Sequence, residues 1–357
     1  MTRLRWERRA APPAWLTPAL PVLAVAATFA LTAVFVVLSG AGPLAAFNEL
    51  FVQPLTTRFT VLEILVSATP LLLTGTAVAV AFRTGYWNIG AEGQLLAGAI
   101  AAAGTGTLVG GLPRPVALLA MGAAGAAAGL GWALLPALLR VRFDIDEVVT
   151  TLLLNPVALL LVTGLLNGPW RDPATGFPES ERIAASAELP PLLARSRLHL
   201  GFVVAVALVA VAWFVTTRTP AGVRLRAVGL SPHAARFAGI DVRRHLLGAA
   251  LVSGAIAGLA GVSEVAGIQY RLTEGVSPGY GYTGIVVATL GALSLPGVAF
   301  GALLLGLVNV GAGTAGRRLG VPSQLGQVVQ ATLLLVVVAL LVLRRYRIVR
   351  AGRGARP

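Results

Sequence analysis

The sequence predicts an all-α, polytopic membrane protein with about ten transmembrane helices, some of them broken or re-entrant. Of its 357 residues, 56% are hydrophobic and only 12% are charged, and the mean hydropathy is +0.82. A soluble domain cannot bury that much apolar surface. Apolar runs of about 20 residues recur along the chain, and each can cross a hydrocarbon core of about 30 Å. We therefore expect one transmembrane domain over about 16–343, between a basic N-terminal segment, 1–15, and a basic tail, 344–357.

The apolar runs and the breakers between them define the expected spans in order. The first run is too long for a signal peptide and lacks a cleavage site, so it is interpreted as a span. A segment rich in Pro and charge, about 167–199, is expected as an external loop, and a polar cytoplasmic segment covers about 217–246. The spans are expected at about 16–39, 60–82, 93–111, 115–139, 147–166, 200–216, 247–266, 282–294, 297–313 and 325–343.

The charges orient the chain and exclude several functions. All 28 basic residues are Arg, and with a cytoplasmic N-terminus 19 of the 28 lie on the inner side, as the positive-inside rule requires. Both termini are then cytoplasmic in an inner or plasma membrane, and the net charge of +14 indicates orientation rather than nucleic-acid binding. The absence of Lys excludes a Walker A loop. The chain has no Cys and only three scattered His, which argues against a metal site.

Polar residues at membrane depth mark the first candidate site. The segment 82–94 joins two apolar runs and contains Trp87, Asn88 and Glu92. A charge at the bilayer centre costs about 2.5–3.5 kcal/mol, so Glu92 should face a cavity, a dipole or water. Non-helical backbone is tolerated at this depth only where it is buried or lines a cavity, which favours a broken helix beside a permeation path. The alternative, that the polar groups only cap the broken backbone, has equal weight.

Two further candidates for substrate contact each have a purely structural alternative. Trp87 either stacks on a planar or sugar ligand or anchors the chain at the interface, and the anchor is favoured. Asn155 either contacts ribose hydroxyls or a base edge or repairs the helix around Pro156. The substrate-path candidates are therefore Trp87, Asn88, Glu92 and Asn155.

The remaining polar and small residues favour structural roles. Glu264 lies within a span, and a structural role is slightly favoured because no Arg is expected at its depth. Asp144, Asp146 and Glu147 adjoin Arg residues at a helix start, which favours capping and ion pairing over catalysis. Gly pairs four residues apart, such as Gly254 and Gly258, favour tight internal helix packing.

The cytoplasmic segment predicts one short helix. Ser231 is suited to the N-cap, Pro232 to the first helical position and Gly239 to the position beyond the end. The helix presents small residues and Phe237 beside Arg236, a surface that needs either a groove in a partner or the membrane surface.

Four segments carry a family resemblance that covers most of the chain: 85–94, 147–155, 225–242 and 277–285. Residues 85–94 resemble a Gly-aromatic-Asn-Ile-Gly-x-Glu-Gly-Gln motif, and 225–242 resembles an Arg-Ala-Val-Gly, Ala-Ala-Arg and Gly-Ile-x-Val pattern. The chain resembles the permease subunits of ABC importers for simple sugars and nucleosides, in the group that includes branched-chain amino acid permeases. The nucleoside branch fits best, although Pro156 and Thr283 depart from its pattern.

The resemblance implies a transport subunit rather than an enzyme. It implies inward transport of nucleosides or simple sugars, no directly bound cofactor, and ATP hydrolysis by a separate ATPase subunit. Implied partners are that ATPase, a second permease subunit, preferably a paralogue, an extracytoplasmic substrate-binding protein and membrane lipid, but no nucleic acid. The alternatives are an ion-coupled secondary transporter, or an ABC permease for ribose-like sugars or branched-chain amino acids. The ATPase-coupling candidates are Ser231, Pro232, Ala235, Arg236, Phe237 and Gly239.

Overall fold

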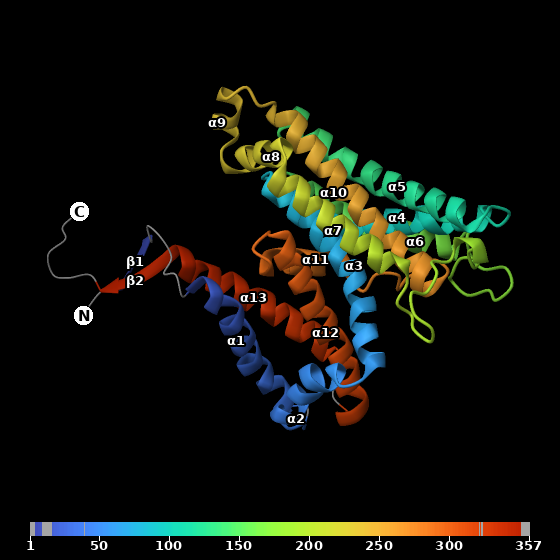
Figure 1. Cartoon of the computed structure of the whole chain (residues 1–357), viewed down its shortest axis with the longest axis horizontal. Coiled ribbons are helices and arrows are strands. Elements are labelled where there is room, and N and C mark those ends of the chain that lie inside the picture. The colour runs from blue at the N-terminus through green and yellow to red at the C-terminus, as the bar shows by residue number, and fades with distance from the viewer. Residues whose placement is uncertain (1–3, 9–15, 39, 321, 323, 351–357) are drawn as a thin grey trace. The chain divides into compact units, whose positions relative to one another are not determined.

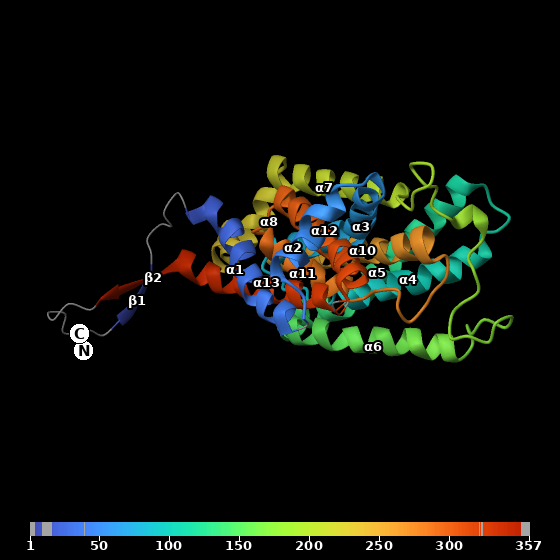
Figure 2. The ribbon, with the colours of Figure 1, turned by 90° about the horizontal axis from the view of Figure 1, so that it is seen from below.

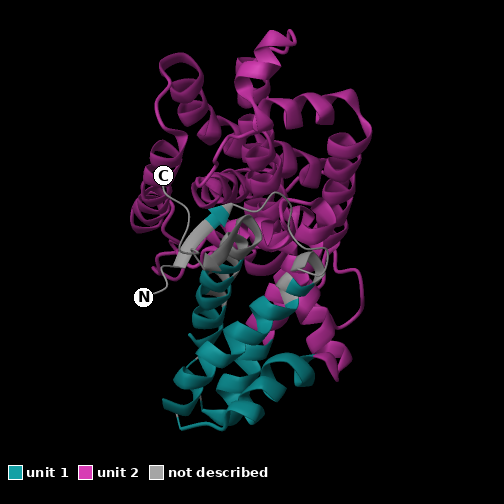
Figure 3. Ribbon diagram, turned by 90° about the vertical axis from the view of Figure 1, so that its left-hand side faces the viewer, with its two compact units in different colours: residues 1–54, 311–357 teal, residues 55–310 magenta. Residues whose placement is uncertain are grey.

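The chain forms two compact units in the computed structural model, which describes residues 4–8, 16–38, 40–320, 322 and 324–350 (Figure 1). One unit comprises residues 55–310, and the other comprises 1–54 with 311–357 (Figure 3). Helix α12, Leu295–Leu319, belongs to both because the division falls within it.

The unit 55–310 is a helical bundle around α10. Helix α10 packs against α3, α4 and α5, while α11 packs against α3. Figure 2 shows α6 and α7 on opposite sides of the layer that contains α10, α5 and α4. Besides α12, its helices are α3 (Arg58–Arg83), α4 (Ala91–Leu108), α5 (Arg114–Phe143), α6 (Glu147–Asn167), α7 (Leu200–Arg218), α8 (Pro220–Leu230), α9 (Pro232–Phe237), α10 (Val242–Glu264) and α11 (Tyr280–Leu290), with a 3₁₀ turn η3 (Ala185–Ala187) and a π turn η4 (Val265–Gln269).

The other unit pairs α1 with α13. It contains α1 (Leu16–Leu38), α2 (Pro43–Phe47), the π turn η1 (Asn48–Val52) and α13 (Leu325–Arg345), and the 3₁₀ turn η2 (Gln53–Leu55) follows η1. Strands β1 (Leu4–Arg8) and β2 (Tyr346–Arg350) pair antiparallel. The all-α prediction did not include them, although Leu4–Glu7 alternates apolar and polar residues, the period typical of a strand.

Each of the ten expected apolar segments coincides with a helix in the described residues. By length and composition, six helices can cross a membrane, namely α3, α5, α6, α7, α10 continued to Gln269, and α12. The pair Val22–Leu38 and Pro43–Leu55, bent by 119°, gives a seventh if it is one span. The chain is therefore a multi-pass membrane protein.

Glycines allow α4, α5 and α10 to approach closely. A Cβ atom on Gly258 would lie 2.2 Å from the carbonyl oxygen of Gly125, and one on Gly98 would lie 2.2 Å from that of Gly258. A Cβ on Gly254 would lie 2.5 Å from the carbonyl oxygen of Gly129. The prediction that these pairs serve tight internal packing is confirmed.

Candidate functional site

The candidate site is built on the break between α3 and α4, residues 84–90. Gly85 adopts a left-handed backbone, with φ of +78°, which ends α3 at low steric cost. The Thr84 hydroxyl donates to the Ala81 carbonyl at 2.6 Å. Between this turn and Ala91 the backbone is not helical, so its N–H groups need partners from other elements.

Helix α6 supplies those partners through three polar side chains on one face. Residues four apart on a helix lie one above the other, and Glu147, Thr151 and Asn155 have that spacing. Glu147 Oε1 accepts from the Trp87 N–H at 3.2 Å, and Thr151 Oγ1 accepts from the Ile89 N–H at 3.2 Å. Asn155 Oδ1 accepts from the N–H of residue 93 at 2.9 Å, while its Nδ2 donates to the Ile89 carbonyl at 2.9 Å.

Asn155 therefore stabilises the start of α4. Of its two side-chain hydrogen bonds, one goes to Ile89 in the break and the other to the first turn of α4, and neither goes to its own helix around Pro156. The first N–H groups of any helix have no partner within that helix, and Asn155 satisfies one of them from α6.

Asn88 holds the centre of the break. Its Nδ2 donates to Gln94 Oε1 and to Ser253 Oγ, both at 2.9 Å. Its Oδ1 accepts from the Gly90 N–H at 3.0 Å and from Gln94 Nε2 at 3.1 Å. Ser253 in turn donates to the Ala77 carbonyl at 2.7 Å. The amide of Asn88 is fully buried and all four of its hydrogen-bonding positions are used.

Glu92 joins the starts of two helices. Its Oε2 accepts from the Gly281 N–H, in the first turn of α11, at 2.6 Å, and Glu92 is 6% exposed. A Cβ on Gly281 would lie 2.1 Å from the Glu92 nitrogen, so the two backbones meet directly. Ser277 Oγ accepts from the Tyr280 N–H at 3.0 Å and so caps α11 as well. A carboxylate beside helix N-termini is favoured by their dipoles, which explains how the buried Glu92 is tolerated.

Trp87 differs from the other three candidates because it is 49% exposed. Its ring lies 4.6 Å from the ring of Phe82, while Asn88, Glu92 and Asn155 are buried. Within the broken segment, Trp87 thus presents an aromatic surface to its surroundings, and the other three hold the backbone.

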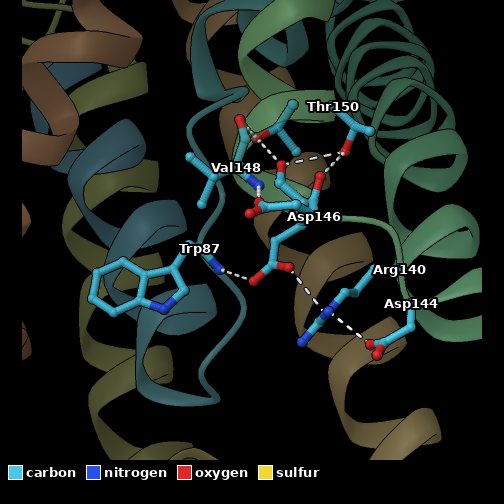
Figure 4. Close-up of polar contacts among 8 residues, drawn as sticks. Trp87, Arg140, Asp144, Asp146, Val148 and Thr150 are labelled. Carbon is cyan, nitrogen blue, oxygen red and sulfur yellow. Dashed lines mark hydrogen bonds and ion pairs between the residues drawn. The ribbon is translucent and has the colours of Figure 1, made fainter.

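The acidic residues at the start of α6 form caps and ion pairs, as expected (Figure 4). Arg140 Nε lies 3.0 Å from Glu147 Oε2, and its Nη1 lies 2.8 Å from Asp144 Oδ1. Asp146 accepts from the Val148 N–H at 2.7 Å and is the N-cap of α6. Figure 4 shows this chain of contacts running from Trp87 to Asp144. Among the described residues, no group of three His, Asp or Glu side chains could hold a metal ion.

The segment 167–199 lies along the chain that follows α10. The Ser180 N–H donates to the Leu272 carbonyl at 3.0 Å, and the Leu189 N–H donates to the Ala266 carbonyl at 2.8 Å. Arg271 pairs with Glu179 and lies 3.9 Å from Asp172. The Ala174 N–H donates a hydrogen bond to Asp172, and this bond holds the pKa of the Asp172 carboxyl below its usual range. The expected loop is therefore fastened to residues 266–272.

Glu264 has a cation nearby, which the sequence did not indicate. It is 5% exposed, and Arg197 of the segment 167–199 interacts with it electrostatically. Hydrogen bonding to Glu63 chiefly raises the pKa of Arg197, and Glu264 adds to that effect.

The short helix expected between Ser231 and Gly239 is present as α9. Ser231 accepts from the Ala234 N–H at 3.2 Å as N-cap, Pro232 is the first helical residue, and Gly239 has φ of +79°. Ala235 packs with Val228 and Val242, which anchors α9 to its neighbours. Arg236 is exposed and Phe237 is 93% exposed, so α9 offers an aromatic side chain with no cover in this chain.

Sequence reasoning missed Thr151 and Ser253 as members of the network around the break, whereas Gln94 was among the polar groups expected to cap it. Thr151 carried a usable signal, because it lies midway between Glu147 and Asn155 at helical spacing in an otherwise apolar run.

A multi-pass bundle whose interrupted helices meet at buried polar groups is typical of membrane transport proteins. The comparison with known proteins is specific: residues 60–338 match the family described as the branched-chain amino acid transport system / permease component. The chain belongs to this family.

Several similar proteins are named as permeases, and each match covers most of this chain and most of the relative. The glucose ABC transporter permease protein TsgB13 of Haloferax volcanii is 38% identical over 97% of this chain and 93% of its own. The guanosine ABC transporter permease protein NupP of Bacillus subtilis is 36% identical over 89% of this chain and 92% of its own. The nucleoside ABC transporter permease protein NupB of Lactococcus lactis is 30% identical over 88% of this chain and 89% of its own.

Proposed function

We propose that this chain is the membrane-spanning permease subunit of an ATP-driven importer for nucleosides or simple sugars. Family membership and the names of the relatives, which cover glucose, guanosine and nucleosides, support the proposal. The chain has no Lys and therefore no Walker A loop, so ATP must be hydrolysed by a separate subunit.

The proposed position of the path rests on one observation. The starts of α4 and α11 meet where Glu92 contacts Gly281. Interrupted helices whose N-termini meet near the middle of a bundle are a recurring way to build a solute site in transporters. In this proposal the segment 84–94 borders the path. Trp87 offers the exposed aromatic face, and Asn88, Glu92 and Asn155 fix the segment's geometry.

The topology that we propose uses all ten expected apolar segments as spans of one permease domain, with both termini in the cytoplasm. The external segment 167–199 then faces the substrate-binding protein. A second permease subunit, a paralogue, completes the pathway. The relatives support this pairing, because the chain also matches NupQ of B. subtilis, at 30% identity, and TsgC13 of H. volcanii, at 26% identity, beside NupP and TsgB13.

Helix α9 is proposed as the coupling helix that docks in the ATPase. Phe237 is 93% exposed, and a large apolar side chain on the cytoplasmic side gains stability by entering a groove. Charge reversal at Arg236 combined with Phe237→Asp should abolish copurification of the ATPase without unfolding the permease. Phe143→Asp, at an exposed Phe that ends α5, is the control. Unchanged copurification of the Arg236 and Phe237 variant would refute the assignment.

The test of function is uptake of labelled guanosine, adenosine, uridine, ribose and glucose by cells with and without this gene. Selective loss of nucleoside uptake on deletion, restored by complementation, supports a nucleoside permease, and loss of ribose or glucose uptake alone assigns a sugar. Uptake that follows an ion gradient and not ATP would overturn the ABC assignment.

A further inference from the structure

A cavity lies apart from the broken helix, in the half of the bundle that contains Arg83 and α8. Helices α7 and α10 (Figure 1) both pack against α3 but make little contact with each other, and the cavity is a groove lined by these three helices. The groove has a volume of about 350 Å³. Its apolar walls come from three helices: Val80, Leu208, Val211, Val215, Val252 and Ile256.

The walls offer no polar group to a ligand. The only polar wall residue other than Arg244 and His245 is Thr216, and its hydroxyl is engaged. Thr216 donates to the Ala212 carbonyl at 2.7 Å and accepts from Arg83 Nη1 at 2.7 Å. The groove therefore suits a hydrocarbon chain.

One end of the groove is strongly basic. Arg244 and His245 line it, and Leu225 of α8 closes it. Arg83 donates to Thr216 of the wall and so adds a further cation to this end. Between Thr216 and Leu246 the sequence has six Arg, with Asp241 as its only acidic residue.

The Arg244 guanidinium has N–H groups that can donate to a ligand. Its Nε lies 3.0 Å from Asp241 Oδ2, and its side chain is 86% exposed. Within the described part of the chain its two Nη groups make no hydrogen bond. A guanidinium suits a phosphate because it can offer two parallel N–H donors.

We propose that the groove between α7 and α10 binds an anionic phospholipid, with an acyl chain along the apolar walls and the phosphate at Arg244. Basic residues at the cytoplasmic end of an intramembrane groove attract anionic headgroups, whereas an apolar groove alone would not distinguish headgroups. The inference does not depend on which solute the permease carries.

Native mass spectrometry of the full chain, purified in detergent and titrated with phosphatidylglycerol or phosphatidylcholine, tests the headgroup contact. Arg244→Gln should weaken phosphatidylglycerol binding roughly fivefold and leave phosphatidylcholine binding unchanged. Asp241→Asn keeps the N-cap of α10 but removes the competing charge, so it should strengthen phosphatidylglycerol binding several-fold. Arg236→Gln, at an exposed Arg on α9, is the matched control and should change neither lipid.

Filling the groove tests the acyl chain. Gly248 lines the groove, and a Cβ there would meet no atom within 4 Å, so Gly248→Leu can fill the space without a clash. It should reduce phosphatidylglycerol binding at least fivefold, as measured by the same titration. Gly131→Leu, at another helix position with nothing within 4 Å, should have no effect.

Three results would overturn the proposal. They are unchanged phosphatidylglycerol binding in Arg244→Gln, equal binding of both lipids by the unaltered chain, and loss of a protein partner in Gly248→Leu without loss of lipid. If Gly248→Leu does not fold, the exposed Arg244 and Asp241 variants decide the question, because neither changes packing in the bundle.

Discussion

The carboxylate of Glu92 accepts a hydrogen bond from the backbone N–H of Gly281, 189 residues further along the chain, at 2.6 Å. The contact joins the first turns of α4 and α11, and Gly281 allows it because any side chain there would collide with the Glu92 backbone. A buried carboxylate is thus balanced by a helix start, and two interruptions of the bundle depend on one another.

The first prediction concerns this junction. Glu92→Leu leaves the Gly281 N–H buried without a partner, which costs about 1–3 kcal/mol, so the thermal midpoint in detergent should fall and uptake should be lost. Glu92→Gln keeps an acceptor oxygen, so its thermal midpoint and its uptake should fall less than those of Glu92→Leu. Glu181→Leu, at an exposed Glu of the segment 167–199, is the control. Normal uptake by Glu92→Leu would show that the carboxylate does not hold the junction.

The second prediction concerns the polar face of α6. Thr151→Val removes the acceptor for the Ile89 N–H without changing side-chain shape, and should destabilise the protein by about 1–3 kcal/mol. The neighbouring Thr150 bonds only to carbonyls of its own helix, so Thr150→Val should stay within about 0.5 kcal/mol. The measurement is the thermal midpoint of the purified chain. Equal midpoints for the two variants would contradict the role of Thr151.

The helices and the break were predictable because their causes are local. Apolar runs separated by Gly, Pro and charge placed ten helical segments, although α5 continues to Phe143 and α10 begins at Val242, beyond the expected limits. Ser231, Pro232 and Gly239 framed α9 by capping preferences alone. Local pattern also placed the interruption at 84–90, since polar residues and Gly cannot continue an apolar helix there cheaply.

The partners of the break were not predictable, because they lie far away in sequence. Asn88 bonds to Ser253 across 165 residues and Glu92 to Gly281 across 189, and hydropathy carries no information on such pairs. The same holds for Arg197, which reaches Glu63 and the neighbourhood of Glu264 from the segment 167–199. Periodicity fixes the face of an element, but only tertiary packing fixes what that face meets.

The third prediction concerns the glycine contacts between α5 and α10. Gly258→Ala places a methyl group 2.2 Å from the Gly125 carbonyl oxygen, so the backbones must separate. Overpacking of this kind costs about 1–3 kcal/mol. Gly131→Ala meets no atom within 4 Å and should be neutral or stabilise the helix. Thermal midpoints of the two variants in one detergent decide the question, and a stable Gly258→Ala would show that the helices can move apart freely.

The fourth prediction concerns His199, the N-cap of α7, whose Nδ1 accepts from the Gly201 N–H at 3.2 Å. Burial lowers the pKa of His199 to about 4. A Cβ on Gly267 would lie 2.5 Å from the imidazole Nε2, so the ring is tightly enclosed, and among the described residues that nitrogen has no hydrogen-bond partner. His199 is therefore neutral in the folded protein at neutral pH.

An unfolded chain takes up a proton at this His below about pH 6.5, whereas the folded chain does so only near pH 4. Stability should therefore be full above pH 6.5 and fall between 6.5 and 4, by on the order of 3 kcal/mol at most. His199→Asn keeps a capping acceptor and removes the titration, so its thermal midpoint should change less between pH 7 and 5, a range above most carboxyl pKa values. His233→Asn, at an exposed His of α9, should retain the full dependence. Identical pH profiles for the unaltered chain and His199→Asn would show that burial of this imidazole does not set the acid limit of the fold.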